Sequence, residues 1–482
     1  MFIKLATCLR RIIYLLLLGF VAPAIWAGET EDFVAVLKTH YEDTLEINAF
    51  TLKYHFLNRR YRVLNYWDFQ APNLYMSQRM VEVDLAKKHF YDNDILYYAG
   101  GRLFDRVQFQ NDDESIFYEK SATSLGRMTL RRGLDNFDRF KSHMLTNIDF
   151  LVVRPIFDEE NTADNMSLLR DVESDTTTLV HTITDEQVVE YTFQNNPIRL
   201  VRINHGPLNG VFHYGDYQTT RGFTYARNIV KYYDGETKPT YIKYIDDFTE
   251  IAKVDPSRLK VPEGYGPEYQ RGDGILVARE IAKELYLVTD SSAARNSLLK
   301  IIDDEIMVFG AAVSKGIAEK TLKLIGKQFP GKKVTSIYVT HPHLNQIAGL
   351  DVFAENGVEI LADEYTISGI KASSGFSETI AKFRFRTITH GESIAGATFY
   401  VLENMHSKRQ SFVHFKDEDI IFQSNLMHIP YDNTIAKVVP NYTKTFIDFI
   451  RSEKLNFNRI VGNYRNNNIS VGVVNKTYEA RL

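Results

Sequence analysis

The sequence predicts two regions of different fold class, an α+β region built on an N-terminal antiparallel sheet and a C-terminal α/β sandwich. The chain has 482 residues, more than one hydrophobic core usually serves. Aromatic residues make up 13% of it, and a high aromatic content favours β-structure. The hydrophobic pattern also changes. It has period two before about residue 262 and alternates between strands and helices after about residue 270.

The first segment, 1–27, has the pattern of a secretory signal peptide. Arg10 and Arg11 precede a nearly unbroken apolar run over 12–21, and Ala27-Gly28 offers small residues for cleavage. The alternative is an uncleaved membrane anchor. The run is shorter than the roughly 20 apolar residues that a spanning helix needs, which favours cleavage and no transmembrane span in the mature chain.

Cysteine usage and charge narrow the class of protein further. The single cysteine, Cys8, lies inside the signal peptide, so the mature chain would contain neither disulfides nor cysteine metal ligands. An exported chain without disulfides is consistent with a bacterial periplasm, and we expect that location. The net charge of −4, without long runs of one sign, indicates no nucleic-acid partner.

Residues 28–262 are expected to form the antiparallel region. A helix is predicted over 30–44, where Phe33, Leu37 and Tyr41 recur at helical spacing. Short aromatic strands separated by turn signals then run to about residue 117, which is typical of a meander. A second helix is predicted over 134–150, followed by more strands. A curved sheet that encloses a helix would fit this pattern and would suit an apolar or lipid-like ligand.

A cluster of proline and glycine between residues 256 and 267 marks the expected boundary, and the second domain is predicted to span 270–482. The hydrophobic pattern of this domain predicts strands that alternate with helices, which indicates an α/β sandwich. The expected strands are 274–277, 285–288, 297–302, 305–309, 334–339 and 358–361, and the expected helices are 317–329 and 351–356.

Two histidines stand at the end of the predicted buried strand 334–339. His341 and His343 are spaced i and i+2, so both imidazoles are expected to point into one cleft, a spacing that metal sites use. The carboxyl ends of sheet strands are also where open α/β folds place their sites. No Gly-x-Ser-x-Gly and no complete Gly-x-x-x-x-Gly-Lys-Ser/Thr motif occurs, which argues against a serine nucleophile and a phosphate-binding loop.

Residues from about 280 to 470 resemble the metallo-β-lactamase fold superfamily. The segment Thr340-His341-Pro342-His343-Leu344-Asn345-Gln346-Ile347-Ala348-Gly349 matches the family pattern Thr-His-x-His-x-Asp-His-x-x-Gly except at the Asp and the last His. The other matching segments are Val358–Glu364, His390-Gly391-Glu392-Ser393 with Gly396, His406-Ser407, Phe412–Phe422, Gln423-Ser424-Asn425-Leu426 and Val461-Gly462-Asn463. The resemblance implies an αββα sandwich for this part of the chain.

The resemblance also implies a metal site, and implies that half of the usual site is missing. One zinc ion would be held by His341, His343 and His406. The positions of the remaining family ligands carry neutral amides, which bind Zn²⁺ weakly, so a second ion is not expected. These degenerate positions are Asn345, Gln346, Asn425 and Asn463, and Phe309 stands where an Asp usually ends an earlier strand.

Two functions remain open from the sequence. Three histidines and a water around one Zn²⁺ would form a hydrolase for an unidentified ester, amide or phosphate. Its general base would have to come from elsewhere, because Asn345 cannot accept a proton, and His390, His414 and His428 are near in sequence. The alternative is a catalytically decayed pseudoenzyme that acts as an envelope binding or scaffold protein for an apolar ligand or a protein partner.

Overall fold

The computed structural model describes residues 27–59, 67–71, 74–98, 101–145, 148–158, 163–184, 187–205, 210–220, 223–233 and 235–480. The expected signal peptide lies outside these residues except for Ala27. By its contacts the chain forms two compact units, Met1–Asn48 with Asp138–Asp246, and Ala49–Phe137 with Asp247–Leu482. These units divide the chain differently from the expected domains, 28–262 and 270–482, which stay predictions.

Among the described helices, none combines the length and the apolar character that crossing a bilayer would require.

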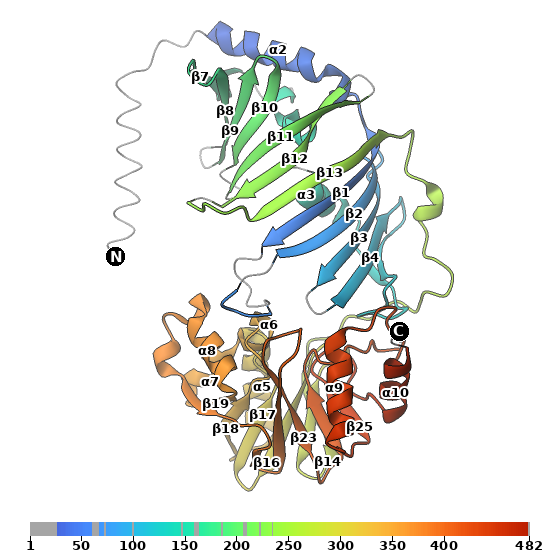
Figure 1. Cartoon of the computed structure of the whole chain (residues 1–482), viewed down its shortest axis with the longest axis vertical. Helices are drawn as coiled ribbons and strands as arrows, with labels where there is room; N and C mark the ends of the chain where they lie inside the picture. The colour runs from blue at the N-terminus through green and yellow to red at the C-terminus, as the bar shows by residue number, and fades with distance from the viewer. Residues whose placement is uncertain are drawn as a thin grey trace. The chain divides into compact units, whose positions relative to one another are not determined.

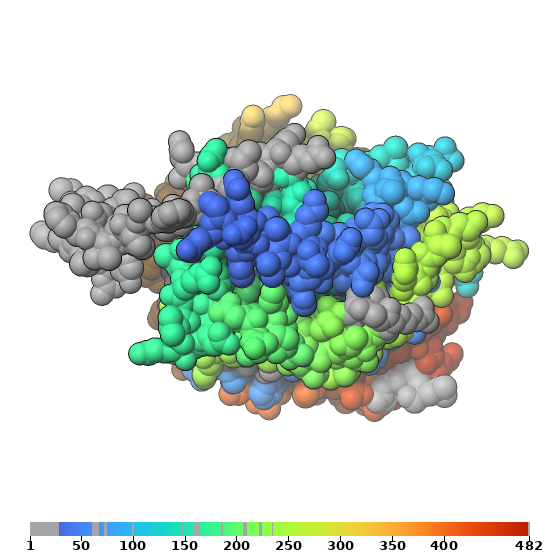
Figure 2. Space-filling model, turned by 90° about the horizontal axis from the view of Figure 1, so that it is seen from above, coloured from blue at the N-terminus to red at the C-terminus, as the bar shows by residue number. Residues whose placement is uncertain are grey.

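The first unit is an antiparallel sheet packed against a long helix. Helix α2 (Ala27–Leu45), which matches the expected helix, buries Leu37 and Tyr41 and places Phe33 5.9 Å from Phe193, between ring centroids. Figure 2 shows α2, in blue, lying along the green strands of this unit. Those strands pair in chain order: β7 (Met166–Asp171), β8 (Thr176–Thr184), β9 (Gln187–Asn195), β10 (Ile198–His205), β11 (Gly210–Thr220), β12 (Phe223–Tyr232) and β13 (Tyr241–Glu250).

The helix expected over 134–150 is two shorter ones, α3 (Asn136–Met144) and α4 (Asp149–Val152). Asp149 is fully buried at the start of α4. The backbone N–H of Ala226 donates to its Oδ2 at 3.0 Å, while its Oδ1 has no partner within the described part of the chain. Burial raises the pKa of this carboxyl to about 7, because desolvation disfavours the charged form.

The second unit begins with a meander, as the alternating aromatic pattern predicts. Its strands are β1 (Ala49–Arg59), β2 (Leu74–Asp84), β3 (His89–Tyr98), β4 (Arg102–Gln110), β5 (Ser115–Glu119) and β6 (Leu130–Arg132), each antiparallel to the next (Figure 1). The end of β13 lies beside β1, where the N–H of Ile251 donates to the carbonyl of Ala49 at 3.0 Å.

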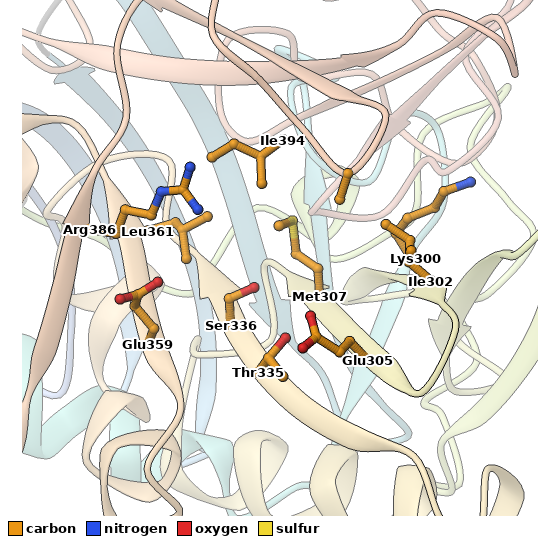
Figure 3. A pocket seen from close by; sticks show the side chains of 11 residues that line it. Lys300, Ile302, Glu305, Met307, Thr335, Ser336, Glu359, Leu361, Arg386 and Ile394 are labelled. Atoms are coloured by element: carbon orange, nitrogen blue, oxygen red, sulfur yellow. The ribbon is translucent and has the colours of Figure 1, made fainter.

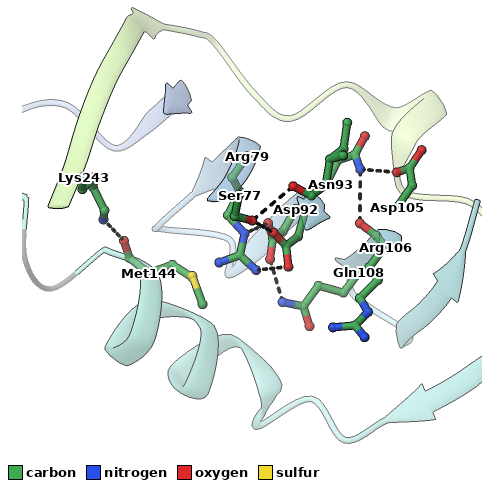
Figure 4. A network of polar contacts seen from close by, with 11 residues as sticks. Ser77, Arg79, Asp92, Asn93, Asp105, Arg106, Gln108, Met144 and Lys243 are labelled. Carbon is green, nitrogen blue, oxygen red and sulfur yellow. Dashed lines mark hydrogen bonds and ion pairs between the residues drawn. The ribbon is translucent and has the colours of Figure 1, made fainter. Parts of the chain in front are cut away.

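A buried polar network crosses this meander (Figure 4). Arg79 Nε lies 2.9 Å from Asp92 Oδ1, and Arg79 Nη2 lies 3.4 Å from Asp94 Oδ2. Gln108 donates to Asp92 at 2.8 Å, and Ser77 donates to Asp94. A guanidinium that is almost fully buried here has two carboxylates, which is how buried charges are normally stabilised.

The Pro/Gly-rich stretch after β13 packs on the meander. Val254 and Leu259, on either side of η5 (Pro256–Arg258), are buried against Val107, Phe109 and Tyr118. A strand expected over 274–277 begins only at Val277, as β14 (Val277–Ala282). That expectation is wrong because the preceding backbone turns. Gly274 has a φ of +67°, and Asp273 Oδ1 accepts from the N–H of Ile275 at 3.0 Å.

Two further sheets follow β14. The first sheet has the order β14-β15-β16-β17-β18-β19-β20 and becomes parallel from β17 onward; the second has the order β21-β22-β23-β24-β25. The bounds of the first are β15 (Leu285–Thr289), β16 (Asn296–Ile302), β17 (Glu305–Phe309), β18 (Lys333–Tyr338), β19 (Glu359–Ala362) and β20 (Arg384–Thr387). Those of the second are β21 (Ser393–Ile394), β22 (Ala397–Leu402), β23 (Gln410–Phe415), β24 (Ile420–Gln423) and β25 (Arg459–Gly462).

Helices cover the outer faces of these two sheets, giving four layers (Figure 1). A core that includes Phe309, Tyr338 and Phe422 lies between the sheets. Helices α5 (Lys315–Gln328), α7 (Leu350–Glu355) and α8 (Glu364–Ala372) pack on the first sheet. Helices α9 (Asn441–Ser452) and α10 (Val471–Glu479) pack on the second. The sheet-rich fold class expected from composition is confirmed, with several separate sheets.

Asp149 makes the stability of the first unit depend on pH. Its pKa is higher in the folded state, about 7, than in an unfolded chain, about 3.9, so the folded state binds the extra proton between these values. On this account we expect the free energy of unfolding to be highest below about pH 4, to fall as the pH rises from about 4 to 7, and to level off above 7. Asp149→Asn should abolish this fall and stabilise the protein above pH 7, measured by urea unfolding at several pH values. An unchanged slope would contradict the prediction.

Candidate metal centre

Three histidines from two different sheets meet at one end of the four-layer part. His341 and His343 follow β18 in the first sheet, and His406 lies in the loop between β22 and β23 of the second. The two loops are joined directly, since the N–H of Ser411 donates to the carbonyl of Thr340 at 2.9 Å. The juxtaposition therefore follows from the packing of the sheets as well as from the local sequence.

The three imidazoles form a compact, buried cluster. Ring centroids are 4.4 Å apart for His341 and His343, 4.7 Å for His343 and His406, and 5.1 Å for His341 and His406. One nitrogen from each ring lies within 4.8 Å of the others. The residues are 0%, 1% and 4% exposed, so the cluster is shielded from water on most sides.

Burial favours the neutral form of two of these rings. It lowers the pKa of His341 and His406 well below the usual range, and the neighbouring histidines lower it further. Neutral imidazole is the form that ligates metal ions. A proton competes poorly at such a site, so the rings are ready to donate lone pairs at neutral pH.

The hydrogen bonds of the cluster fit a metal ion. The Nδ1 of His341 lies 2.8 Å from the hydroxyl of Thr340, a contact that orients the ring as partners of ligating histidines do. Both ring nitrogens of His406 are buried and have no hydrogen-bond partner among the described residues. Buried polar atoms are rarely left in this state, and an ion bound by the three rings would satisfy one of them.

Asn425 lies between this cluster and a fourth histidine. Its Nδ2 is 3.4 Å from His341 Nε2, and its Oδ1 is 2.6 Å from His428 Nε2. His428 Nε2 is also 2.9 Å from Nη1 of Arg102, which reaches the site from β4. Burial first, and then nearby arginines, lower the pKa of His428 well below the usual range.

The other three positions where the sequence predicts degenerate ligands differ in their contacts. Asn463 donates from Nδ2 to the carbonyls of Asn296 at 2.7 Å and Gly310 at 2.9 Å, which ties together the ends of β25, β16 and β17. Gln346 donates to the hydroxyl of Tyr464 at 2.9 Å. Asn345 is half-buried, and its Oδ1 has no partner in the described part of the protein.

A short segment from the meander covers one side of the cluster. Trp67 donates from Nε1 to the carbonyl of Asn404 at 2.8 Å, and its own carbonyl accepts from the N–H of Lys408 at 2.7 Å. Asp68 pairs with Lys408 at 2.8 Å, and the N–H of Phe69 donates to the hydroxyl of Tyr365 at 3.1 Å. These contacts flank His406 on both sides of its loop.

Several residues at the site escape sequence reasoning. Of the three other histidines considered, only His428 reaches the cluster; His390 lies 3.1 Å from the carbonyl of Val401, and His414 lies 2.7 Å from that of Asn456. The sequence holds no signal for Arg102 or Trp67, because each meets the site across more than 300 residues of chain.

A separate cavity of about 320 Å³ opens at the opposite end of the two sheets (Figure 3). It is lined by side chains near the beginnings of β17, β18 and β19, including Glu305, Thr335 and Glu359, and by Ile394 from the second sheet. The histidines follow the carboxyl end of β18, so this cavity takes no part in their chemistry.

Comparison with known proteins found similar solved structures but no matching family. No family model matches it, and no curated protein is similar to it in sequence. Two similar solved structures are a metallo-β-lactamase from Hirschia baltica, at 14% identity, and the metallo-β-lactamase FIM-1 from Pseudomonas aeruginosa in its mono-zinc form, at 12% identity. Each covers 42% of this chain with a TM-score of 0.34, and the alignments span 97% and 94% of those proteins. At these values the likeness assigns no role to any residue here.

The two unpartnered ring nitrogens of His406 should lower the stability of the metal-free protein by a measurable amount. We expect His406→Leu to raise the free energy of unfolding by about 1–3 kcal/mol, since it removes buried polar atoms that lack partners. The same change should abolish any stabilisation by added Zn²⁺, measured by thermal unfolding.

His181 provides the matched control. It is 0% exposed, and both of its ring nitrogens also lack partners within the described residues, but it lies outside the cluster. His181→Leu should therefore stabilise the metal-free protein similarly and leave the response to Zn²⁺ intact. Equal zinc responses in both variants would contradict a metal site at His406.

Proposed function

We propose that this chain is an exported, metallo-β-lactamase-like protein that binds one zinc ion through His341, His343 and His406 and hydrolyses an ester, amide or phosphate. The observation that carries the proposal is a cluster of three buried imidazoles in which neither ring nitrogen of His406 has a hydrogen-bond partner among the described residues. Export rests on the N-terminal pattern, and we retain the domains 28–262 and 270–482, the latter as an αββα sandwich, as part of the proposal.

A zinc ion held by three histidines acts as a Lewis acid and lowers the pKa of a water in its open position to roughly 7. The protein's own residues supply the remaining requirements. Thr340 fixes the ring orientation of His341, and the segment around Trp67 excludes water from one side. Asn425 holds its amide between His341 and His428, where it can orient a polar group of the substrate.

The proposed site lacks an effective general base to accept a proton during hydrolysis. His428 is the titratable side chain that contacts the cluster through Asn425, but burial and nearby arginines keep its pKa low, so it is a poor general base. Asn345 cannot accept a proton at all. Any hydrolysis is therefore expected to be slow and to depend on the metal.

Zinc binding is the primary test. Protein purified without a histidine tag should contain close to one zinc per chain, and His341→Ala and His406→Ala should lose it. His390→Ala serves as the control, because His390 is exposed and bonded to the backbone of Val401. Wild-type protein that lacks zinc, and whose melting temperature is unchanged by added Zn²⁺, would refute the proposal.

If zinc binds, a carboxylate at Asn345 should restore a proton acceptor. We expect Asn345→Asp to raise the hydrolysis of an activated ester by at least about tenfold, since general-base catalysis typically contributes 10²–10⁴. Asn345→Ala is the control, because it removes the amide without adding a base. An equal rate in both variants would show that a missing base is not what limits the reaction.

A second candidate function has its own observation. Asn463 and Gln346 donate their amide N–H groups to structural hydrogen bonds, which is the condition expected of a fold that does not serve two-metal chemistry. The chain would then be a pseudoenzyme that binds an apolar ligand or an envelope protein. Native mass spectrometry of freshly purified protein distinguishes the two: co-purified lipid on a zinc-free chain favours the pseudoenzyme.

A further inference from the structure

Three arginines from distant parts of the chain converge beside the histidine cluster. Arg102 starts β4, Arg295 lies in the turn before β16, and Arg465 follows β25. Arg102 Nη1 is 2.9 Å from His428 Nε2. The guanidinium carbon of Arg295 is 3.7 Å from the ring centroid of Tyr464, and that ring is 5.8 Å from the ring of His428.

The third arginine belongs to the same group. The backbone N–H of Arg465 donates to the carbonyl of Ala294, next to Arg295, at 3.3 Å. In line with these contacts, the charges of Arg102, Arg465 and Arg295 all lower the pKa of His428, after the larger effect of burial. Arg465 also lies near the ring of Tyr431, 5.9 Å from its centroid.

No acidic side chain in the described part of the protein balances these charges. None of the three arginines has a carboxylate within 4.0 Å there, in contrast to Arg79, which has two. Arg102 is 7% exposed and its Nε has no partner, and Nη1 of Arg295 is also buried without a partner. Buried charges are costly unless an opposite charge compensates them, and the contacts of Arg102 and Arg295 with His428 and the ring of Tyr464 supply none, so their positive charge is available to an anionic ligand.

The position of the arginines connects them to the metal centre. His428 reaches His341 through the amide of Asn425. The hydroxyl of Tyr464 accepts from Gln346 at 2.9 Å and lies 3.4 Å from the carbonyl of Asn345. The histidine cluster is buried, whereas Arg295, His428, Tyr464 and Arg465 are half-buried. This side of the cluster therefore reaches solvent.

We propose that Arg102, Arg295 and Arg465 form an anion subsite that binds a phosphate group of the substrate beside the three histidines. The subsite rests on the proposed function only for its role in catalysis. Guanidinium groups bind phosphate oxygens with paired N–H donors. Several unbalanced positive charges match a phosphate dianion better than a carboxylate, which carries a single negative charge. Of the three substrate classes in the proposed function, an ester, an amide or a phosphate, the arginines therefore favour a phosphate ester.

The test uses the full chain, freed of metal by a chelator and titrated calorimetrically with inorganic phosphate at low ionic strength. Arg465→Gln and Arg295→Gln should each weaken binding by about tenfold or more, the loss of one charge-assisted contact. Arg102→Lys keeps the charge and should bind within a few-fold of wild type. Arg271→Gln is the control, because Arg271 is exposed and far from these contacts in the sequence.

Each outcome has a defined meaning, provided circular dichroism shows that the variants are folded. Absence of phosphate binding, or equal binding by Arg465→Gln, Arg295→Gln and the control, overturns the subsite. Acetate binding as tightly as phosphate overturns the choice of phosphate. Zinc content is measured in parallel. Stoichiometric zinc without phosphate binding would contradict the proposed subsite and leave the proposed zinc hydrolase standing. Arginine-dependent phosphate binding by a chain that never takes up zinc would contradict the hydrolase and leave the subsite standing.

Discussion

Where two sheets pack face to face, the polar groups of the loops at the end of the interface are buried and need hydrogen-bond partners inside the protein. The histidine site depends on this constraint. The N–H of Ser411 donates to the carbonyl of Thr340 at 2.9 Å, and the hydroxyl of Tyr338 donates to that of Ser411 at 2.8 Å. These bonds set the loop of His406 against the loop of His341. Buried polar groups are nearly always satisfied in folded proteins, and both ring nitrogens of His406 lack a partner among the described residues, as those of His181 do. At His406 the unpartnered ring lies beside two other imidazoles, and this combination marks the site.

The need for internal hydrogen-bond partners also accounts for the contacts of Asn463. Its amide donates to two backbone carbonyls, one of them that of Gly310. A Cβ at Gly310 would lie 2.6 Å from Asn463 Nδ2 and 2.5 Å from Phe422 Cζ, so this close approach needs glycine. Gly310 also has a φ of +79°, a conformation that other residues rarely adopt. The amide of Asn463 thus links the ends of β25, β16 and β17.

The hydrophobic pattern of the sequence correctly predicted several strands and helices whose formation depends mainly on neighbouring residues. The buried run 334–339 is strand β18, the helix over 317–329 is α5, and His341 and His343 follow the strand as expected. The pattern failed where the deciding contact was a turn, at Gly274, or a break in a periodic helix, between α3 and α4. Arg102 could not be predicted, because nothing in its own neighbourhood indicates a partner 326 residues away.

The contacts of Trp67 and Arg102 also bear on the order in which the site forms. Trp67 meets Asn404 across 337 residues, whereas the three histidines lie within one continuous part of the chain. Pairings between distant residues form late in folding, since they carry the largest loop-closure cost. The histidines can therefore meet while the segment around Trp67 is still undocked. An ion would then have an additional route into the nascent cluster, from the side that Trp67 later covers, which makes metal loading a question of timing during folding as well as of affinity.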